Sequence, residues 1–187
     1  MKITLSKNEM LGRFRLAGGF EHLRSDCTIE ATAGVALDAL LAEQLRRRYT
    51  ELLSEGPREL LVVEDMSATA GEASYHSGGT GVVRLPADCA RLFEISLEGW
   101  ERPAAVAPAE ALEALLMRGD NAYTAPTAER PSAAMGADGR TVYVHPASGS
   151  RKITLARGVR DPGPDKYTLE EAGLSWIFER MKTDFML

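Results

Sequence analysis

The sequence predicts a single α+β domain over residues 1–187, with long amphipathic helices packed on a small, mainly antiparallel sheet that includes a β-hairpin. Three patterns lead to this prediction. Leucines recur at helical spacing over residues 37–53, opposite a charged side. Apolar and polar residues alternate from Phe93 to Leu97, as in a strand with one wet face. Asp138-Gly139 separates two short apolar runs, which is a hairpin signal because this pair tolerates positive φ.

Two helices are predicted in the first third of the chain. The first spans about residues 6–16, because Ser6 and Glu9 have the spacing of a capping box and Gly18-Gly19 ends the pattern. Residues 20–33 are expected to be mostly loop. The second helix spans about residues 34–54 and stops at Gly56-Pro57. Its single apolar stripe is expected to lie on the sheet.

Strands are predicted mainly within residues 59–106 and 131–157, where the apolar spacing changes from helical to extended. The stretch 67–80 is rich in Ser, Gly, Ala and Thr and is expected to be a mobile loop. Pro108 opens a helix over about residues 108–118. Residues 132–135 and 141–145 form the arms of the hairpin, a further strand covers 152–156, and residues 157–166 form a connector.

The last predicted helix spans about residues 168–184, with Thr168 and Glu171 as a second capping box. Three apolar residues follow it: Phe185, Met186 and Leu187. Apolar side chains at such a position are usually docked on the chain itself or on a neighbour. We therefore count these three residues as candidate interface residues.

Composition and charge argue against several classes of function. The net charge is −5 and the pI is about 5.3, whereas non-specific nucleic-acid binding needs clustered Lys and Arg to neutralise phosphates. The first residues are too short and polar for a signal peptide, and no apolar run approaches the ~18–20 residues that span a membrane. Cys27 and Cys89 are too widely spaced for a disulfide framework or a zinc motif, so reduced thiols are expected.

No catalytic or metal motif is recognisable, and no cofactor is expected. His22, His76 and His145 sit far apart without a local ligand spacing. The glycines of Ser77–Gly81 resemble a phosphate loop but precede a β-rich segment, so a flexible loop is expected. One alternative stays open, a small enzyme or ligand-binding domain with its site near His76 or His145.

Trp100 and Arg102 lie where a strand ends, between Gly99, which suggests a bend, and Pro103, which suits a sheet edge. The indole either caps the sheet or anchors an interface, because aromatic and arginine side chains are frequent interface anchors. Both interpretations stay open, and we add the two residues to the candidate interface.

Three phrases of the middle third occur in a fixed order. They are Arg84-Leu85-Pro86-Ala87-Asp88-Cys89-Ala90-Arg91-Leu92, then Gly99-Trp100-Glu101-Arg102-Pro103, and finally Asn121-Ala122-Tyr123, Glu129-Arg130-Pro131 and Thr141-Val142-Tyr143-Val144-His145-Pro146. Together they resemble head–tail connector and tail adaptor proteins of tailed bacteriophages, in versions from phages and prophages of gut bacteria. The resemblance covers about 60 residues well and the rest only by element order.

This resemblance implies a non-enzymatic virion assembly protein with helices around a small sheet. It implies phage portal and tail proteins as partners, self-association into a ring on assembly, and no catalytic residues. It also implies that the protein acts in the cytoplasm of the host cell and then in the virion.

Overall fold

The computed structural model describes residues 1–17, 37–119, 121, 123–148 and 151–185. The chain divides into two compact units. Unit 1 combines both ends of the chain, Met1–Val62 and Asp161–Leu187, and unit 2 is the continuous stretch Val63–Arg160. The expectation of a single domain stays a prediction. Among the described residues, no helix combines the length and the apolarity needed to cross a membrane.

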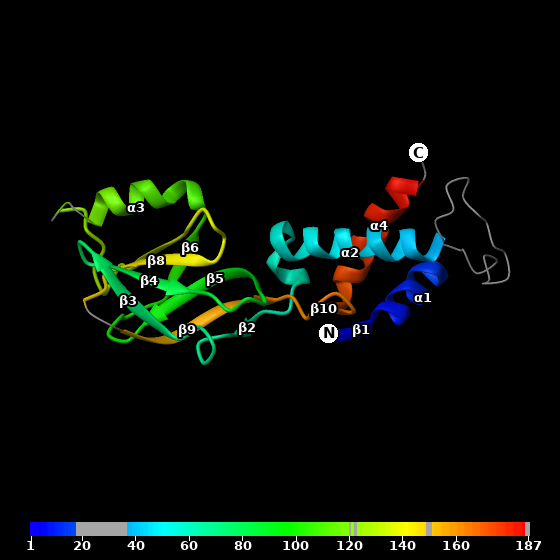
Figure 1. Ribbon diagram of the computed structural model, residues 1–187, viewed down its shortest axis with the longest axis horizontal. Coiled ribbons are helices and arrows are strands. Elements are labelled where there is room, and N and C mark those ends of the chain that lie inside the picture. Colours follow the sequence, from blue (N-terminus) through cyan, green and yellow to red (C-terminus); the bar gives the residue numbers. More distant parts are fainter. Residues whose placement is uncertain (18–36, 120, 122, 149–150, 186–187) are drawn as a thin grey trace. The chain divides into compact units, whose positions relative to one another are not determined.

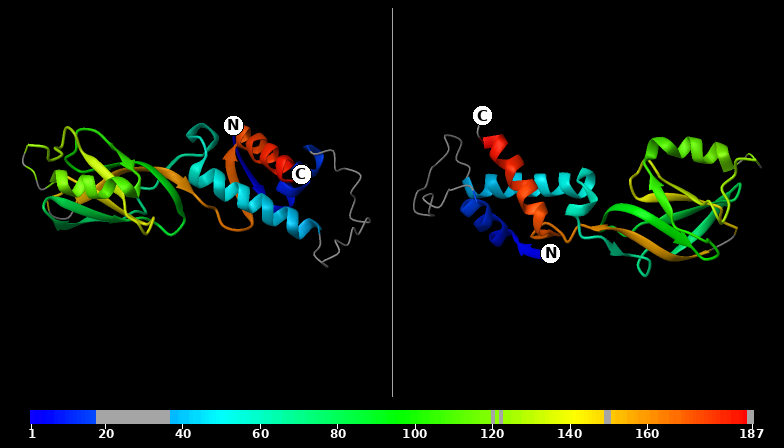
Figure 2. Two further views of the ribbon diagram at one scale, coloured as in Figure 1. Left: turned by 90° about the horizontal axis from the view of Figure 1, so that it is seen from above. Right: turned by 180° about the vertical axis from the view of Figure 1, so that it is seen from behind.

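Unit 1 packs helices beside a short antiparallel ribbon (Figures 1 and 2). Its elements are β1 (Lys2–Ser6), α1 (Lys7–Ala17), α2 (Leu37–Glu55), the 3₁₀ turn η2 (Arg58–Leu60), β10 (Lys166–Glu170) and α4 (Glu171–Phe185). β1 pairs with β10, and α2 packs against α4. The rings of Phe14 and Phe178 meet edge to face, with centroids 5.4 Å apart, so α1 and α4 share one core.

The capping box at the start of α1 is confirmed. The amide of Ser6 donates to Oε2 of Glu9 at 2.8 Å, and the amide of Glu9 donates to Oγ of Ser6 at 3.3 Å. These bonds satisfy backbone donors that a helix N-terminus leaves without partners. Residues 18–33, which hold the expected loop, lie outside the described residues.

The second predicted capping box is wrong, because Thr168 lies in β10 and α4 begins at Glu171. Thr168 pairs with Thr4 of β1, and its amide and carbonyl both bond the hydroxyl of Tyr49, at 2.9 and 3.0 Å. Burial raises the pKa of Tyr49 to about 12. A β-branched residue suits a strand, and here the pairing with β1 outweighs the local capping signal.

Unit 2 contains, within the described residues, a closed barrel of seven strands (Figure 1). In sheet order these are β9 (Arg151–Arg160), β3 (Glu72–Ser77), β4 (Thr80–Arg84), β8 (Thr141–His145), β7 (Ser132–Met135), β6 (Ala104–Ala107) and β5 (Cys89–Leu97). β5 pairs with β9 and so closes the barrel. The short strand β2 (Glu64–Asp65) pairs with a different stretch of β9 from β3, at Arg157 and Gly158.

The helix predicted over 108–118 connects two parallel strands of the barrel. β6 and β7 run parallel, and parallel neighbours need a crossover rather than a tight turn. The 3₁₀ turn η3 (Ala109–Ala111) and α3 (Leu112–Gly119) form this crossover, and α3 packs on β7. Leu115 is buried and holds α3 to the barrel.

The predicted hairpin is confirmed as β7 and β8. Asp138 accepts from the amides of Arg140 and Thr141 and from the hydroxyl of Thr141. The bond from the Thr141 hydroxyl is the main reason that the pKa of Asp138 falls to about 2. Gly139 has a φ of +65°, as the turn requires.

The predicted fold class is wrong. The chain is a β-dominated fold with a closed barrel, not a set of helices on a small sheet. α1, α2 and α4 belong to unit 1, whereas the predicted strands between residues 72 and 157 belong to the barrel of unit 2. Alternation shows that a strand has one wet face, but it does not show that β5 and β9 meet across some sixty residues of sequence.

Candidate functional site

The strand ladder on one side of β9 is interrupted. β2 pairs with β9 at Arg157 and Gly158, and β3 pairs with it at Arg151 and Lys152. Ala156 lies in the gap, but its amide and carbonyl are held by the Asp65 carboxylate and the Met66 amide, at 3.0 and 2.7 Å. Among the described residues, Ile153 and Leu155 therefore have ladder partners in β5 only, and Thr154 between them, at a register shift, has none.

The gap exists because the chain loops out between β2 and β3, over residues 66–71. The side chains of Met66 and Ala70 are buried in the barrel core and anchor both ends of this loop. Thr69 adds a third anchor, because Nη2 of Arg160 donates to its hydroxyl at 2.7 Å. The loop is thus fixed to the barrel and stands away from β9 at its tip.

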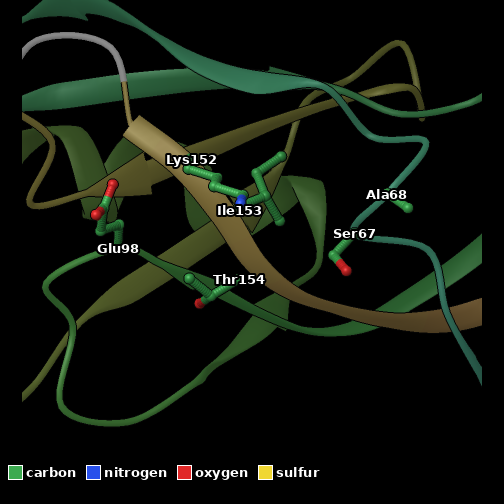
Figure 3. A pocket seen from close by; sticks show the side chains of 6 residues that line it. All are labelled: Ser67, Ala68, Glu98, Lys152, Ile153 and Thr154. Atoms are coloured by element: carbon green, nitrogen blue, oxygen red, sulfur yellow. The ribbon is translucent and has the colours of Figure 1, made fainter.

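A groove of about 520 Å³ lies between the tip of this loop and β9 (Figure 3). We call it the β9 groove, and its lining consists of Ser67, Ala68, Glu98, Lys152, Ile153 and Thr154. The two loop residues are small, so a ligand backbone can approach closely. Among the described residues, no group of three His, Cys, Asp or Glu side chains could hold a metal ion. The lining instead offers the hydroxyls of Ser67 and Thr154, the carboxylate of Glu98 and the ammonium group of Lys152.

A second candidate surface lies on the crossover between β6 and β7. Leu116 and Met117 of α3 are 37% and 64% exposed, and Tyr123, shortly after the helix, is fully exposed. We call these three residues the α3 patch. Large apolar side chains on a surface mark interaction sites when they gather, although single ones need no explanation.

Of the five residues predicted as an interface, Trp100 and Arg102 belong to unit 2, and Phe185, Met186 and Leu187 belong to unit 1. The Trp100 ring packs against the barrel core, and its Nε1 donates to the carbonyl of Pro146 at 2.9 Å. Arg102 is exposed on the same turn. Phe185 ends α4, but its side chain, Met186 and Leu187 lie outside the described residues. The interface role of these residues stays a prediction.

Trp100→Phe is expected to lower the free energy of unfolding by about 1–2 kcal/mol, because it removes the hydrogen bond to Pro146 and part of a buried ring. Urea unfolding followed by circular dichroism measures this loss. The control is Trp176→Phe, which only weakens a stacking contact with Arg180 at 4.1 Å, because a phenyl ring also accepts a cation, and which should cost about 0.5 kcal/mol. Equal losses in the two variants would show that the indole of Trp100 is not a structural anchor.

The glycine loop expected to be flexible is a tight turn between β3 and β4. The expectation of a mobile loop over 67–80 is therefore wrong for residues 72–80, whereas residues 67–71 do belong to the loop between β2 and β3. Ser77 pairs with Thr80, and Gly78 and Gly79 between them have φ of +55° and +75°. Both central residues of such a two-residue hairpin turn need positive φ, which glycine adopts at little cost. Pairing of β3 with β4 and β9 fixes the segment despite its loop-like composition.

The two histidines of the alternative site have different surroundings. His145 is 4% exposed, and its ring lies against Gly79 of this turn. Its Nδ1 has no hydrogen-bond partner among the described residues. His76 is exposed, and its ring centroid lies 6.2 Å from that of Tyr143. Neither histidine lines the β9 groove.

Burial lowers the pKa of His145 below its ordinary value of 6.5. The folded barrel therefore holds this ring neutral, and the unfolded chain takes up the proton at a higher pH. We expect the free energy of unfolding to fall as the pH drops below about 6.5 and to level off below the folded pKa. His145→Phe should flatten this decline in urea titrations at several pH values, whereas the control His76→Gln should keep it. A decline that survives in His145→Phe would contradict this cause.

The β9 groove and the α3 patch were not predicted from the sequence. The segment 67–80 was assigned to loop, which hid the interrupted pairing of β2 and β3 with β9. A partial signal was present for the α3 patch, because Leu115, Leu116 and Met117 are three consecutive apolar residues and cannot all lie on one face of a helix. Comparison with protein-family models and with curated proteins finds no match for this chain.

Proposed function

We propose that the chain is a non-enzymatic virion assembly protein, a head–tail connector or tail adaptor of a tailed phage or prophage. It joins a ring through contacts with portal and tail proteins and with its own copies, first in the host cytoplasm and then in the virion. The observation that carries this proposal is the α3 patch, in which Leu116 and Met117 of α3 and Tyr123, shortly after the helix in the sequence, are exposed large apolar residues of one crossover.

The composition of the α3 patch suits a protein interface. Tyrosine and methionine are enriched in interface cores, because they bury a large area on contact. α3 already uses Leu115 to hold itself on the barrel, so the exposed residues are not needed for that anchor. Their exposure costs free energy in isolated chains and is recovered when a partner covers them.

The residues that resemble phage connectors lie in the same unit as the α3 patch. The first phrase runs from the end of β4 into β5, the second forms the turn after β5, and the end of the third is β8 with Pro146. The first phrase also has a structural role, since Asp88 forms a salt bridge with Arg160 across the barrel wall. The resemblance therefore concerns the barrel and supports an assembly role for unit 2.

The α3 patch is tested with the portal protein encoded near this chain in its source genome. Tyr123→Ser is expected to weaken binding of the chain to the portal at least about tenfold, as for an aromatic interface anchor. Surface plasmon resonance measures the affinity. The control is Tyr75→Ser, which removes a 54% exposed tyrosine from β3, and we expect no change. Equal affinities for both variants, or a genome without portal or tail genes beside this one, would contradict the proposal.

A further inference from the structure

The ribbon of unit 1 has one open edge, along β1. It contains only β1 and β10, and within the described residues no other strand pairs with either. We infer that the open edge takes β1 of a second copy of the chain, in antiparallel register, so that two ribbons form one four-stranded sheet. This inference goes beyond the proposed function and does not rest on it, because the contact lies in unit 1 and needs no phage partner.

The register of the ribbon decides which backbone groups point outward. The amide of Glu171 donates to the carbonyl of Met1 at 3.0 Å, and the amide of Lys7 donates to the carbonyl of Asp165 at 3.0 Å. Backbone groups in an antiparallel pair alternate between facing the partner strand and facing away from it. The odd-numbered residues of β1 therefore bond β10, whereas the amide and carbonyl of Thr4 point away from it. Among the described residues these two groups have no hydrogen-bond partner.

The far side of β10 is already closed by α2. The amide of Thr168 donates to the hydroxyl of Tyr49 at 2.9 Å, and this hydroxyl donates to the carbonyl of Thr168 at 3.0 Å. Nη1 of Arg46 donates to the carbonyl of Lys166 at 3.4 Å. A strand cannot add on this side, so the ribbon can grow only at β1. Two copies must then meet through the same edge, which makes the contact two-fold symmetric and ends growth of the sheet at a dimer.

The sequence of β1 fits a second copy of itself. When Thr4 lies opposite Thr4 of the second copy, the two residues exchange two backbone hydrogen bonds and all of β1 overlaps. The hydroxyls of Thr4 and Thr168 lie 3.2 Å apart, so this pairing extends a row of threonines across four strands, and opposed threonines stabilise a sheet. On the other face, Ile3 is only partly buried, and it would lie opposite Leu5 of the second copy and lose further contact with water.

Charge and hydrogen bonding favour this register over others. Pairing centred on Ser6 is excluded, because the amide of Ser6 already donates to the Glu9 carboxylate at 2.8 Å. With Thr4 at the centre, Lys2 lies opposite Ser6 of the second copy and so approaches that carboxylate. Opposite charges that meet across an interface fix its register, and two-fold symmetry provides this pair twice.

Thr4→Pro in the full chain tests this inference. Proline removes the outward amide of residue 4 and none of the hydrogen bonds between β1 and β10, so it blocks an added strand and keeps the ribbon. We expect the native chain to sediment as a monomer–dimer equilibrium over a concentration series, and Thr4→Pro to raise the dimer dissociation constant at least about tenfold. The matched control is Thr4→Val, which loses the same hydroxyl contact with Thr168 but keeps the amide, and its dissociation constant should stay close to that of the native chain.

Hydrogen exchange followed by NMR gives a second readout that needs no variant. The amide of Thr4 should exchange fast in the dilute native chain and slowly in the concentrated chain. The amides of Ile3 and Leu5, which face β10, should exchange slowly at both concentrations and so report that the ribbon is intact.

Four outcomes would overturn the inference. They are a native chain that stays monomeric over the whole series, a Thr4→Pro dimer as tight as the native one, and a Thr4→Val dimer weakened as much as that of Thr4→Pro. The fourth is a Thr4 amide that exchanges slowly even in the dilute chain, which would show that another segment of the same chain covers the edge.

Failure of this inference can be told apart from failure of the proposed function. Sedimentation and hydrogen exchange use copies of this chain alone, whereas the proposed function is tested by portal binding through Tyr123. Dimers through β1 in a chain that does not bind the portal would keep the inference and remove the proposed function. Portal binding by a chain that stays monomeric would do the reverse.

Discussion

Gly158→Ala is expected to prevent closure of the barrel. Gly158 lies in β9 between β2 and β5, opposite Glu64 on one side and Leu92 on the other. A Cβ at this position would stand 2.5 Å from the carbonyl oxygen of Arg91 and 2.5 Å from the terminal methyl of Met66. The methionine can move because its side chain is flexible. The carbonyl can move only if β5 separates from β9, and this pair closes the barrel.

We expect this substitution to lower the free energy of unfolding by at least about 3 kcal/mol, the upper end of the usual cost of overpacking. Urea unfolding and the dispersion of amide signals in NMR spectra measure the effect. The control is Gly12→Ala, where nothing lies within 4 Å of the new Cβ in the middle of α1. That variant should gain about 1 kcal/mol from helix propensity. A Gly158→Ala variant as stable as the native chain would refute the closed barrel.

Gly79→Ala is expected to have the second largest effect, about 2–5 kcal/mol of destabilisation. Two costs add at this position. A φ of +75° costs an L-residue about 1–2 kcal/mol. The new Cβ would also stand 2.8 Å from Cε1 of His145, a buried ring that cannot turn away, and such overpacking costs about 1–3 kcal/mol.

Gly139→Ala separates these two costs. Gly139 has a φ of +65° in the turn between β7 and β8, but nothing lies within 4 Å of a Cβ there. Gly139→Ala should therefore lower the free energy of unfolding only by the cost of the positive φ, about 1–2 kcal/mol. Combining Gly79→Ala with His145→Ala should recover part of the loss, since the two residues are in contact. Equal unfolding midpoints for Gly79→Ala and Gly139→Ala would show that the turn does not press on His145.

The elements that sequence reasoning identified are those fixed by neighbouring residues. The spacing of Ser6 and Glu9 was enough to place the start of α1, and Asp138-Gly139 was enough to place the turn between β7 and β8. The helix predicted over 34–54 is α2, Leu37–Glu55, as far as the described residues show. In each case the pattern needs only contacts within a few residues, or one wet and one dry side.

Long-range pairing explains what the sequence did not reveal. β10 is extended because it pairs with β1 at the other end of the chain, and this pairing overrides the capping signal of Thr168 and Glu171. β3 is a strand because β4 and β9 hold it, although its composition is that of a loop. The β9 groove exists because β2 and β3 pair with separate stretches of β9 and leave the residues between them without a partner on that side. No local pattern encodes where a ladder is interrupted.

The candidate interface shows the same division between local and long-range effects. The sequence left open whether Trp100 caps the sheet or anchors an interface, and in the structure its indole is docked on the barrel through Pro146. Whether such a ring caps a sheet or meets a partner depends on Pro146, which is 46 residues away. In the same way, the exposure of Leu116 and Met117 is decided by which face of α3 packs on β7, a strand that comes later in the sequence.

Electron microscopy of the portal ring mixed with an excess of this chain tests the proposed function most directly. The portal protein for this test is taken from the genes that flank this chain in its source genome, and flanking genes that encode no portal protein would also contradict the proposed function. We expect an added ring of density on one end of the portal, with the barrel and the α3 patch at its contacts. Portal particles that remain unchanged while the chain sediments alone, at concentrations well above those of phage assembly, would contradict an assembly role at the head–tail junction.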